Sequence, residues 1–222
     1  MSKEIWASVD RYVGELLWPG DEALEAALDA SEAAGLPRIS VTANQGKLLQ
    51  LMAQMVEAKQ ILEIGTLGGF STIHLARGLG AGGRVITLEA EAKHAEVARV
   101  NIARAGLAEA VEIRLGKALE TLPQLVAEGE GPFDLIFIDA DKENIPDYFV
   151  WSLKLARVGT VIIVDNVVRN GAVADASSTD ASVRGVRRFN VMLAAEKRVS
   201  ATVIQTVGSK GYDGFALVRV TA

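Results

Sequence analysis

Three ionisable side chains follow a short apolar segment in the second half of the chain. Residues 135–138, Leu-Ile-Phe-Ile, are typical of a strand that is buried on both faces, and Asp139, Asp141 and Lys142 come directly after it. Open α/β sheets bind their ligands at the carboxyl ends of their strands. A strand that simply runs into a solvated turn is the alternative for this segment, so the remaining sequence must decide.

A second polar pair follows the next predicted strand. Residues 161–164, Val-Ile-Ile-Val, lead into Asp165 and Asn166, which we expect at the same sheet edge as Asp139. Carboxylate and amide oxygens suit a hard divalent cation such as Mg²⁺, Ca²⁺ or Mn²⁺. Asp and Asn also cap loops without binding anything, and this alternative remains open for the pair on its own.

The composition excludes several classes of function. The 222 residues are 50% hydrophobic, enough for the core of one α/β domain, and the net charge of -5 argues against a nucleic-acid partner. The absence of cysteine excludes disulfides, thiolate metal sites and cysteine nucleophiles. We find neither a signal peptide nor an apolar run that would span a bilayer, so we expect a cytoplasmic protein without membrane contact.

The pattern of apolar residues predicts a single domain with two parts. Residues 1–58 read as a helical N-terminal extension, and residues 59–222 read as an α/β core. In the core, predicted strands at 60–64, 84–88, 111–115, 135–138 and 160–164 alternate with predicted helices at 71–79, 92–105, 118–127 and 145–156. Such alternation is typical of a doubly wound, Rossmann-like parallel sheet.

The C-terminal segment departs from this alternation. Predicted strands at 198–207 and 215–220 are separated only by residues 208–214, and so short a connection indicates an antiparallel hairpin. The sequence therefore predicts a seven-stranded sheet of five parallel strands and a terminal hairpin.

A glycine-rich turn joins the first predicted strand to its helix. A dinucleotide site would need a second glycine where Gly65-Thr-Leu-Gly68-Gly69 has Leu67, so a pyrophosphate ligand is disfavoured. A tight turn with Ser71 as helix N-cap is the structural alternative. Glu89, at the end of the second strand, could accept both hydroxyls of a ribose. With Glu63 it indicates an adenosine pocket without a diphosphate, the shape of S-adenosylmethionine.

Three motifs together resemble one family. Glu63-Ile-Gly-Thr-Leu-Gly-Gly-Phe-Ser71, Phe137-Ile-Asp-Ala-Asp-Lys142 and Val164-Asp-Asn-Val167 are similar to the signatures of cation-dependent O-methyltransferases, the group of caffeoyl-coenzyme A and catechol O-methyltransferases. The resemblance runs in register from about residue 39 to 220. It implies a class I methyltransferase fold, a small phenolic substrate and a homodimer.

The resemblance also implies roles for particular residues. The metal ligands would be Asp139, Asp165 and Asn166, with Mg²⁺ the preferred ion, and Asn170 would contact the substrate. Val41 stands where plant relatives often have Thr, so it could offer only a backbone contact. The cofactor contacts implied by the resemblance are Val41, Glu63, Gly65, Thr66, Ser71, Glu89, Ala118 and Asp141.

Lys142 is the candidate base of the implied reaction, with Asp139 as the second catalytic residue. A divalent cation on vicinal phenolic oxygens lowers the pKa of the hydroxyl, and Lys142 could take the proton. A free lysine is already protonated near neutral pH, so this role requires a depressed pKa. An ion pair of Lys142 with Asp139 or Asp141 is the structural alternative. An NAD-dependent oxidoreductase and a non-catalytic cofactor-binding subunit are the competing functions.

Overall fold

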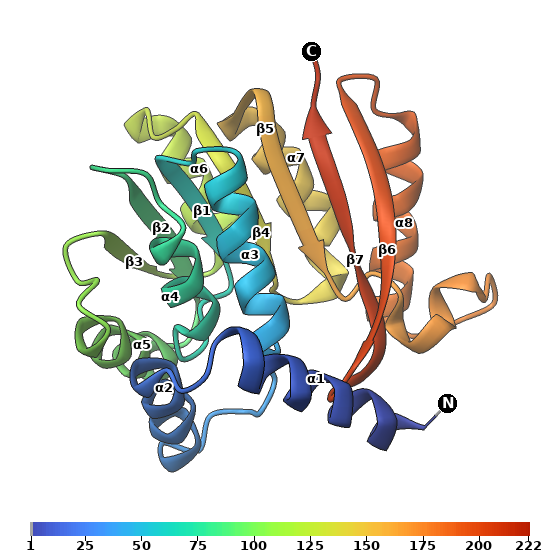
Figure 1. Cartoon of the computed structure of the whole chain (residues 1–222). Coiled ribbons are helices and arrows are strands. Elements are labelled where there is room, and N and C mark those ends of the chain that lie inside the picture. Colours follow the sequence, from blue (N-terminus) through green and yellow to red (C-terminus); the bar gives the residue numbers. More distant parts are fainter. Residues whose placement is uncertain (1) are drawn as a thin grey trace.

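A computed structural model describes residues 2–222, which form one mixed sheet of seven strands in the order β3-β2-β1-β4-β5-β7-β6 (Figure 1). The sheet confirms the predicted fold class. The five parallel strands and the two antiparallel strands are β1 (Gln60–Ile64), β2 (Arg84–Glu89), β3 (Val111–Leu115), β4 (Phe133–Ile138), β5 (Ala156–Asp165), β6 (Val199–Gly208) and β7 (Gly211–Val220).

Strands β1, β4 and β5 lie side by side and bring the predicted site residues to one edge of the sheet. β4 pairs in parallel with β1 on one side and with β5 on the other, with Ile138 level with Ile64 and Val164. The residues that follow these three positions therefore leave the sheet side by side. The chain order reverses at β1 and β4, which is the switch point where open α/β sheets bind ligands.

Alternate residues of the strands enter two separate cores. Leu62, Ile136 and Ile162 belong to a core on one face, which α6 (Ala118–Glu128), α7 (Ile145–Leu155) and α8 (Ala181–Ala195) cover. Ile61 and Leu135 belong to a core on the other face, under α3 (Ala43–Met55) and α4 (Phe70–Arg77). Both faces are covered, which explains the continuous apolar runs in the parallel strands.

The N-terminal helices contact both the core and the hairpin. α2 (Glu22–Ala33) contacts α4 and α5 (Ala92–Arg104), and α3 packs on α4. α1 (Lys3–Leu17) has no buried residue and lies across one end of the β6–β7 hairpin (Figure 1). Its Asp10 accepts a hydrogen bond from the amide of Ser209 at 2.8 Å. None of the helices formed by residues 2–222 is long and apolar enough to cross a bilayer.

The predicted boundaries were wrong in the hairpin. Residues 208–214 were expected to form a loop, yet β6 and β7 pair as far as Gly208 and Gly211, leaving Ser209 and Lys210 as the turn. Gly214 lies inside β7, where a Cβ would overlap the carbonyl oxygen of Ile204. Glycine here permits a close approach of backbone within a strand rather than marking a loop. β5 likewise begins at Ala156, four residues before the predicted start.

Candidate active site

A cavity of about 480 Å³ lies at the carboxyl ends of β1, β2 and β4. This volume is within the range of small-molecule sites, roughly 300–1,000 Å³. Seven of the eight predicted cofactor contacts line it, together with Asp139, Lys142 and Asn166. The seven are Val41, Gly65, Thr66, Ser71, Glu89, Ala118 and Asp141. We call it the cofactor cavity.

The glycine turn brings the backbone of β1 against that of β4. Gly65 has a φ of 103°, and a Cβ there would overlap the carbonyl oxygen of Asp139. Only glycine satisfies both conditions. Gly69, with a φ of 83°, is the N-cap of α4, so the structural alternative that made Ser71 the N-cap does not hold. The Ser71 side chain instead donates to Glu63 Oε1 at 2.6 Å.

Glu63 does not line the cavity, although it was predicted to contact the cofactor. Its side chain is fully buried beneath the turn and accepts hydrogen bonds from the hydroxyls of Ser71, Thr72 and Thr87. Burial raises the pKa of Glu63 to about 7, and the three hydroxyls oppose that shift. In this structure Glu63 holds the glycine turn from behind.

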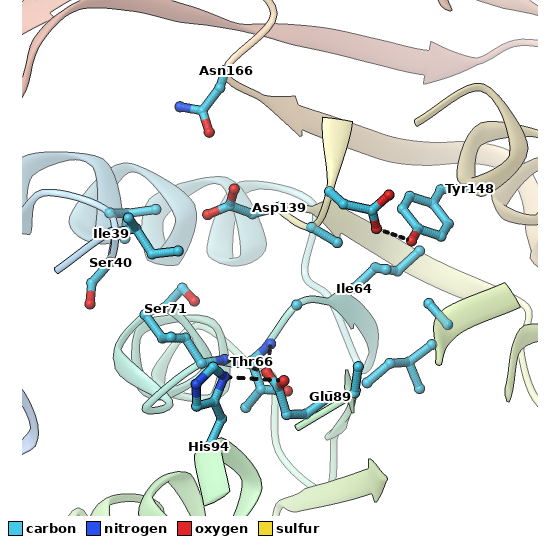
Figure 2. A pocket seen from close by; sticks show the side chains of 18 of the residues that line it. Ile39, Ser40, Ile64, Thr66, Ser71, Glu89, His94, Asp139, Tyr148 and Asn166 are labelled. Atoms are coloured by element: carbon cyan, nitrogen blue, oxygen red, sulfur yellow. Dashed lines mark hydrogen bonds and ion pairs between the residues drawn. The ribbon is translucent and has the colours of Figure 1, made fainter. Parts of the chain in front are cut away.

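Glu89 lies at the end of the cavity far from Asn166, with His94 beside it (Figure 2). Its Oε2 accepts the amides of Thr66 and Leu67 at 3.2 and 2.7 Å, so the carboxylate fixes the glycine turn. His94 Nδ1 lies 3.4 Å from Glu89 Oε1. Sequence patterns alone do not assign His94 a role, since a lone histidine in a predicted helix is not specific to any function.

Asp141 is fixed by two side chains that follow it in the chain. Its Oδ2 accepts from Asn144 Nδ2 at 2.6 Å, and its Oδ1 accepts from the hydroxyl of Tyr148 (Figure 2). Burial and the contact with Asp141 raise the pKa of Tyr148, which keeps the phenol protonated as a donor. Tyr148 packs in the core on one face of the sheet, and it also lines the cofactor cavity.

Asp139 and Lys142 form an ion pair in the part of the cofactor cavity away from Glu89. Lys142 Nζ lies 2.7 Å from Asp139 Oδ1, and both side chains are largely buried. The contact expected under the structural alternative is therefore present. Asn166 has a φ of 58° and lies close by, facing Asp139 across the cavity (Figure 2).

Asp165 completes the predicted acid pair. It is 4% exposed at the end of β5, and burial together with the charge of Asp139 raises the pKa of Asp165 to about 7. Lys142 opposes this shift. Two neighbouring carboxylates with an amide oxygen beside them are the oxygen donors that a hard cation prefers.

A second cavity of about 300 Å³ adjoins the first. Asn166 and Val41 line both, and Asp165 and Asn170 line the second, which we call the acceptor cavity. The structure thus brings Asp139, Asp165 and Asn166 to the boundary between the two cavities. Asn170 reaches the acceptor cavity with a φ of 54°, in a loop that the sequence marks only as polar.

Comparison with known proteins decides the family. The O-methyltransferase family matches residues 21–221, almost the whole chain. The chain belongs to the O-methyltransferase family. The catechol O-methyltransferase of Niastella koreensis is 56% identical over 99% of this chain and 100% of its own length, and that of Mycobacterium tuberculosis is 57% identical over 96% and 94%.

Solved structures agree with this O-methyltransferase assignment. An O-methyltransferase from Bacillus cereus in complex with SAH superposes with a TM-score of 0.98 at 58% identity, covering 99% of this chain and 100% of that one. TomG from Streptomyces achromogenes, solved with SAM, gives a TM-score of 0.96 at 53% identity, with both chains covered completely. This chain is an S-adenosylmethionine-dependent O-methyltransferase, and the oxidoreductase alternative is not favoured.

Proposed function

We propose that this O-methyltransferase methylates a hydroxyl of a vicinal dihydroxy phenol with the help of a divalent cation. The observation that carries the proposal is the convergence of Asp139, Asp165 and Asn166 where the cofactor and acceptor cavities meet. The names of the two catechol O-methyltransferase relatives support the same acceptor class.

The donor set fits a hard cation. Within residues 2–222, no three His, Cys, Asp or Glu side chains gather as a metal site, and the proposed ligands are instead two carboxylates and one amide oxygen. Mg²⁺ binds through few carboxylates and retains places for waters or substrate oxygens, and Ca²⁺ or Mn²⁺ accept the same donors. When bound, such a cation lowers the pKa of a phenolic hydroxyl.

The protein residues position the reaction and move the proton. S-adenosylmethionine supplies a methyl group on a sulfonium, and transfer leaves S-adenosylhomocysteine. Glu89 and Asp141 are the proposed polar contacts at the two sides of the cofactor cavity. Because both are already oriented by protein donors, the cofactor would meet a preorganised site. Lys142 is the proposed acceptor of the phenolic proton, a role that requires a bound cation to replace it as the partner of Asp139. Asn170 is the proposed substrate contact.

The test is a methylation assay with catechol, S-adenosylmethionine and Mg²⁺, with product detected by mass spectrometry. We expect methylated catechol to form, and we expect EDTA or Asp139→Ala to abolish it while Asp134→Ala, a carboxylate far from the site, does not. Activity that survives both chelation and Asp139→Ala would overturn the cation-dependent mechanism. The homodimer and the cytoplasmic location remain predictions, which light scattering and fractionation can check.

A further inference from the structure

The acceptor cavity has a single cationic side chain in its wall. Among the described residues that line it, Lys210 is the one Lys or Arg, and it belongs to the exposed turn between β6 and β7, whereas Asp165 lies at the end of β5 and Asn166 also lines the cofactor cavity. Desolvation lowers the pKa of Lys210, and the charges of Asp139 and Asp165 oppose that shift. Lys210 forms no hydrogen bond or ion pair with any other side chain of residues 2–222.

The acids in the same wall are already engaged. Asp213 Oδ1 accepts three backbone amides at 2.9–3.0 Å, those of Val168, Arg169 and Gly214. These bonds hold the loop after Asp165, in which Arg169 and Asn170 both have positive φ. Asp165 belongs to the proposed cation site. Neither carboxylate is therefore a free partner for Lys210.

Asp10 fixes the turn that carries Lys210. Its Oδ2 accepts the amide of Ser209, and its Oδ1 accepts Asn44 Nδ2, both at 2.8 Å. The two-residue turn between β6 and β7 is thus tied to α1 and α3. The backbone of Lys210 is therefore held beside the acceptor cavity.

From this arrangement we propose that Lys210 makes the acceptor cavity selective for vicinal diphenols that carry a carboxylate. The inference rests on the proposed function, because the two hydroxyls must occupy the end of the cavity near Asp165 and Asn166. A ring held there directs its substituent along the cavity toward the turn that carries Lys210. An ammonium without a protein partner attracts an anionic substituent and gives a neutral one no comparable gain.

The test compares 3,4-dihydroxybenzoate with its methyl ester, which share the ring and differ in charge. For the parent enzyme with Mg²⁺ at low ionic strength, we expect kcat/KM about 2- to 5-fold higher for the acid, since a partly exposed charge pair gives an effect of this order. Lys210→Met should remove the preference, and Lys210→Arg should retain it. Lys197→Met, an exposed lysine far from both cavities, is the matched control.

Binding gives a second readout that needs no turnover. We expect the acid to bind the protein loaded with S-adenosylhomocysteine and Mg²⁺ more tightly than the ester, with the difference reduced by added salt and lost in Lys210→Met. A preference for the ester, or an acid preference that Lys210→Met leaves intact, would overturn the inference. Failure of the parent enzyme to methylate catechol would instead overturn the proposed function, so the two failures are distinguishable.

Discussion

The hydroxyl of Ser71, on the wall of the cofactor cavity, donates at 2.6 Å to the fully buried carboxyl of Glu63. This bond joins the solvent side of the glycine turn to a group that water does not reach. Burial raises the pKa of Glu63 to about 7, so between pH 4.5 and 7 the folded protein retains a proton there that the unfolded chain releases.

Glu63 should therefore make the unfolding free energy depend on pH. Between pH 4.5 and 7 the folded state binds more protons at this group, so its contribution falls as pH rises, by about 3 kcal/mol in total. Glu63→Gln, which keeps the shape, should match the parent at pH 4.5 and exceed it at pH 8. Urea unfolding at both pH values measures this, and equal pH slopes in the two proteins would contradict it.

Lys142→Met should lower kcat for catechol by about 10²–10⁴-fold, the usual contribution of a positioned proton acceptor. The affinity for S-adenosylmethionine, measured by calorimetry, should change little, because the role assigned to Lys142 concerns the proton alone. Lys154→Met, on the outer side of α7, is the matched control and should keep full activity. The rate loss should shrink at high pH, where the phenol ionises without a protein base, and a loss that stayed the same at high pH with the fold intact would contradict the assigned role.

Glu89→Gln should weaken S-adenosylmethionine binding by about tenfold and leave the KM for catechol unchanged. The amide retains an oxygen for the amides of Thr66 and Leu67 but loses the charge, and hydrogen bonds to a charged group are the stronger ones. Calorimetric titration with the cofactor gives the affinity. A variant with unchanged cofactor affinity would show that Glu89 serves only the turn.

Gly65→Ala should destabilise the protein by roughly 3 kcal/mol or more, through the strain of a positive φ and overlap with the backbone of Asp139. Gly82→Ala is the control, because Gly82 also has a positive φ of 72° but has open space around it. That variant should cost about 1 kcal/mol. Thermal unfolding compares the two, and equal costs would show that the close approach to Asp139 is unimportant.

The sequence predicted the sheet because its parallel strands are apolar on both faces and end in recognisable polar groups. It also predicted the meeting of Asp139 with Asp165 and Asn166, since neighbouring parallel strands end at one edge. Glu63 was misplaced because the pattern Glu-x-Gly gives the position of a side chain along the strand. It does not show that Ser71, Thr72 and Thr87 enclose the carboxyl.

The residues that the sequence missed depend on contacts between distant segments. His94 lies beside Glu89 only because the first turn of α5 follows directly on β2 and bends back over its end. Lys210 reaches the acceptor cavity because the hairpin turn is two residues long and is tied to Asp10, almost 200 positions earlier. Glycine at positions 208, 211 and 214 indicated a loop and so concealed that turn.

The two cavities draw on different parts of the chain. Residues 39–41 and Asn166 line both cavities. The rest of the cofactor cavity is lined by residues 64–148 and Arg169, whereas the acceptor cavity takes most of its wall from α1, α3 and residues 165–215. Substitutions in the segments of the second group can accumulate without disturbing the glycine turn or Glu89. Homologues of this architecture are therefore free to diverge in the compound they modify while the methyl donor stays the same, and exchanging α1 together with the hairpin between two homologues should transfer acceptor preference as a unit.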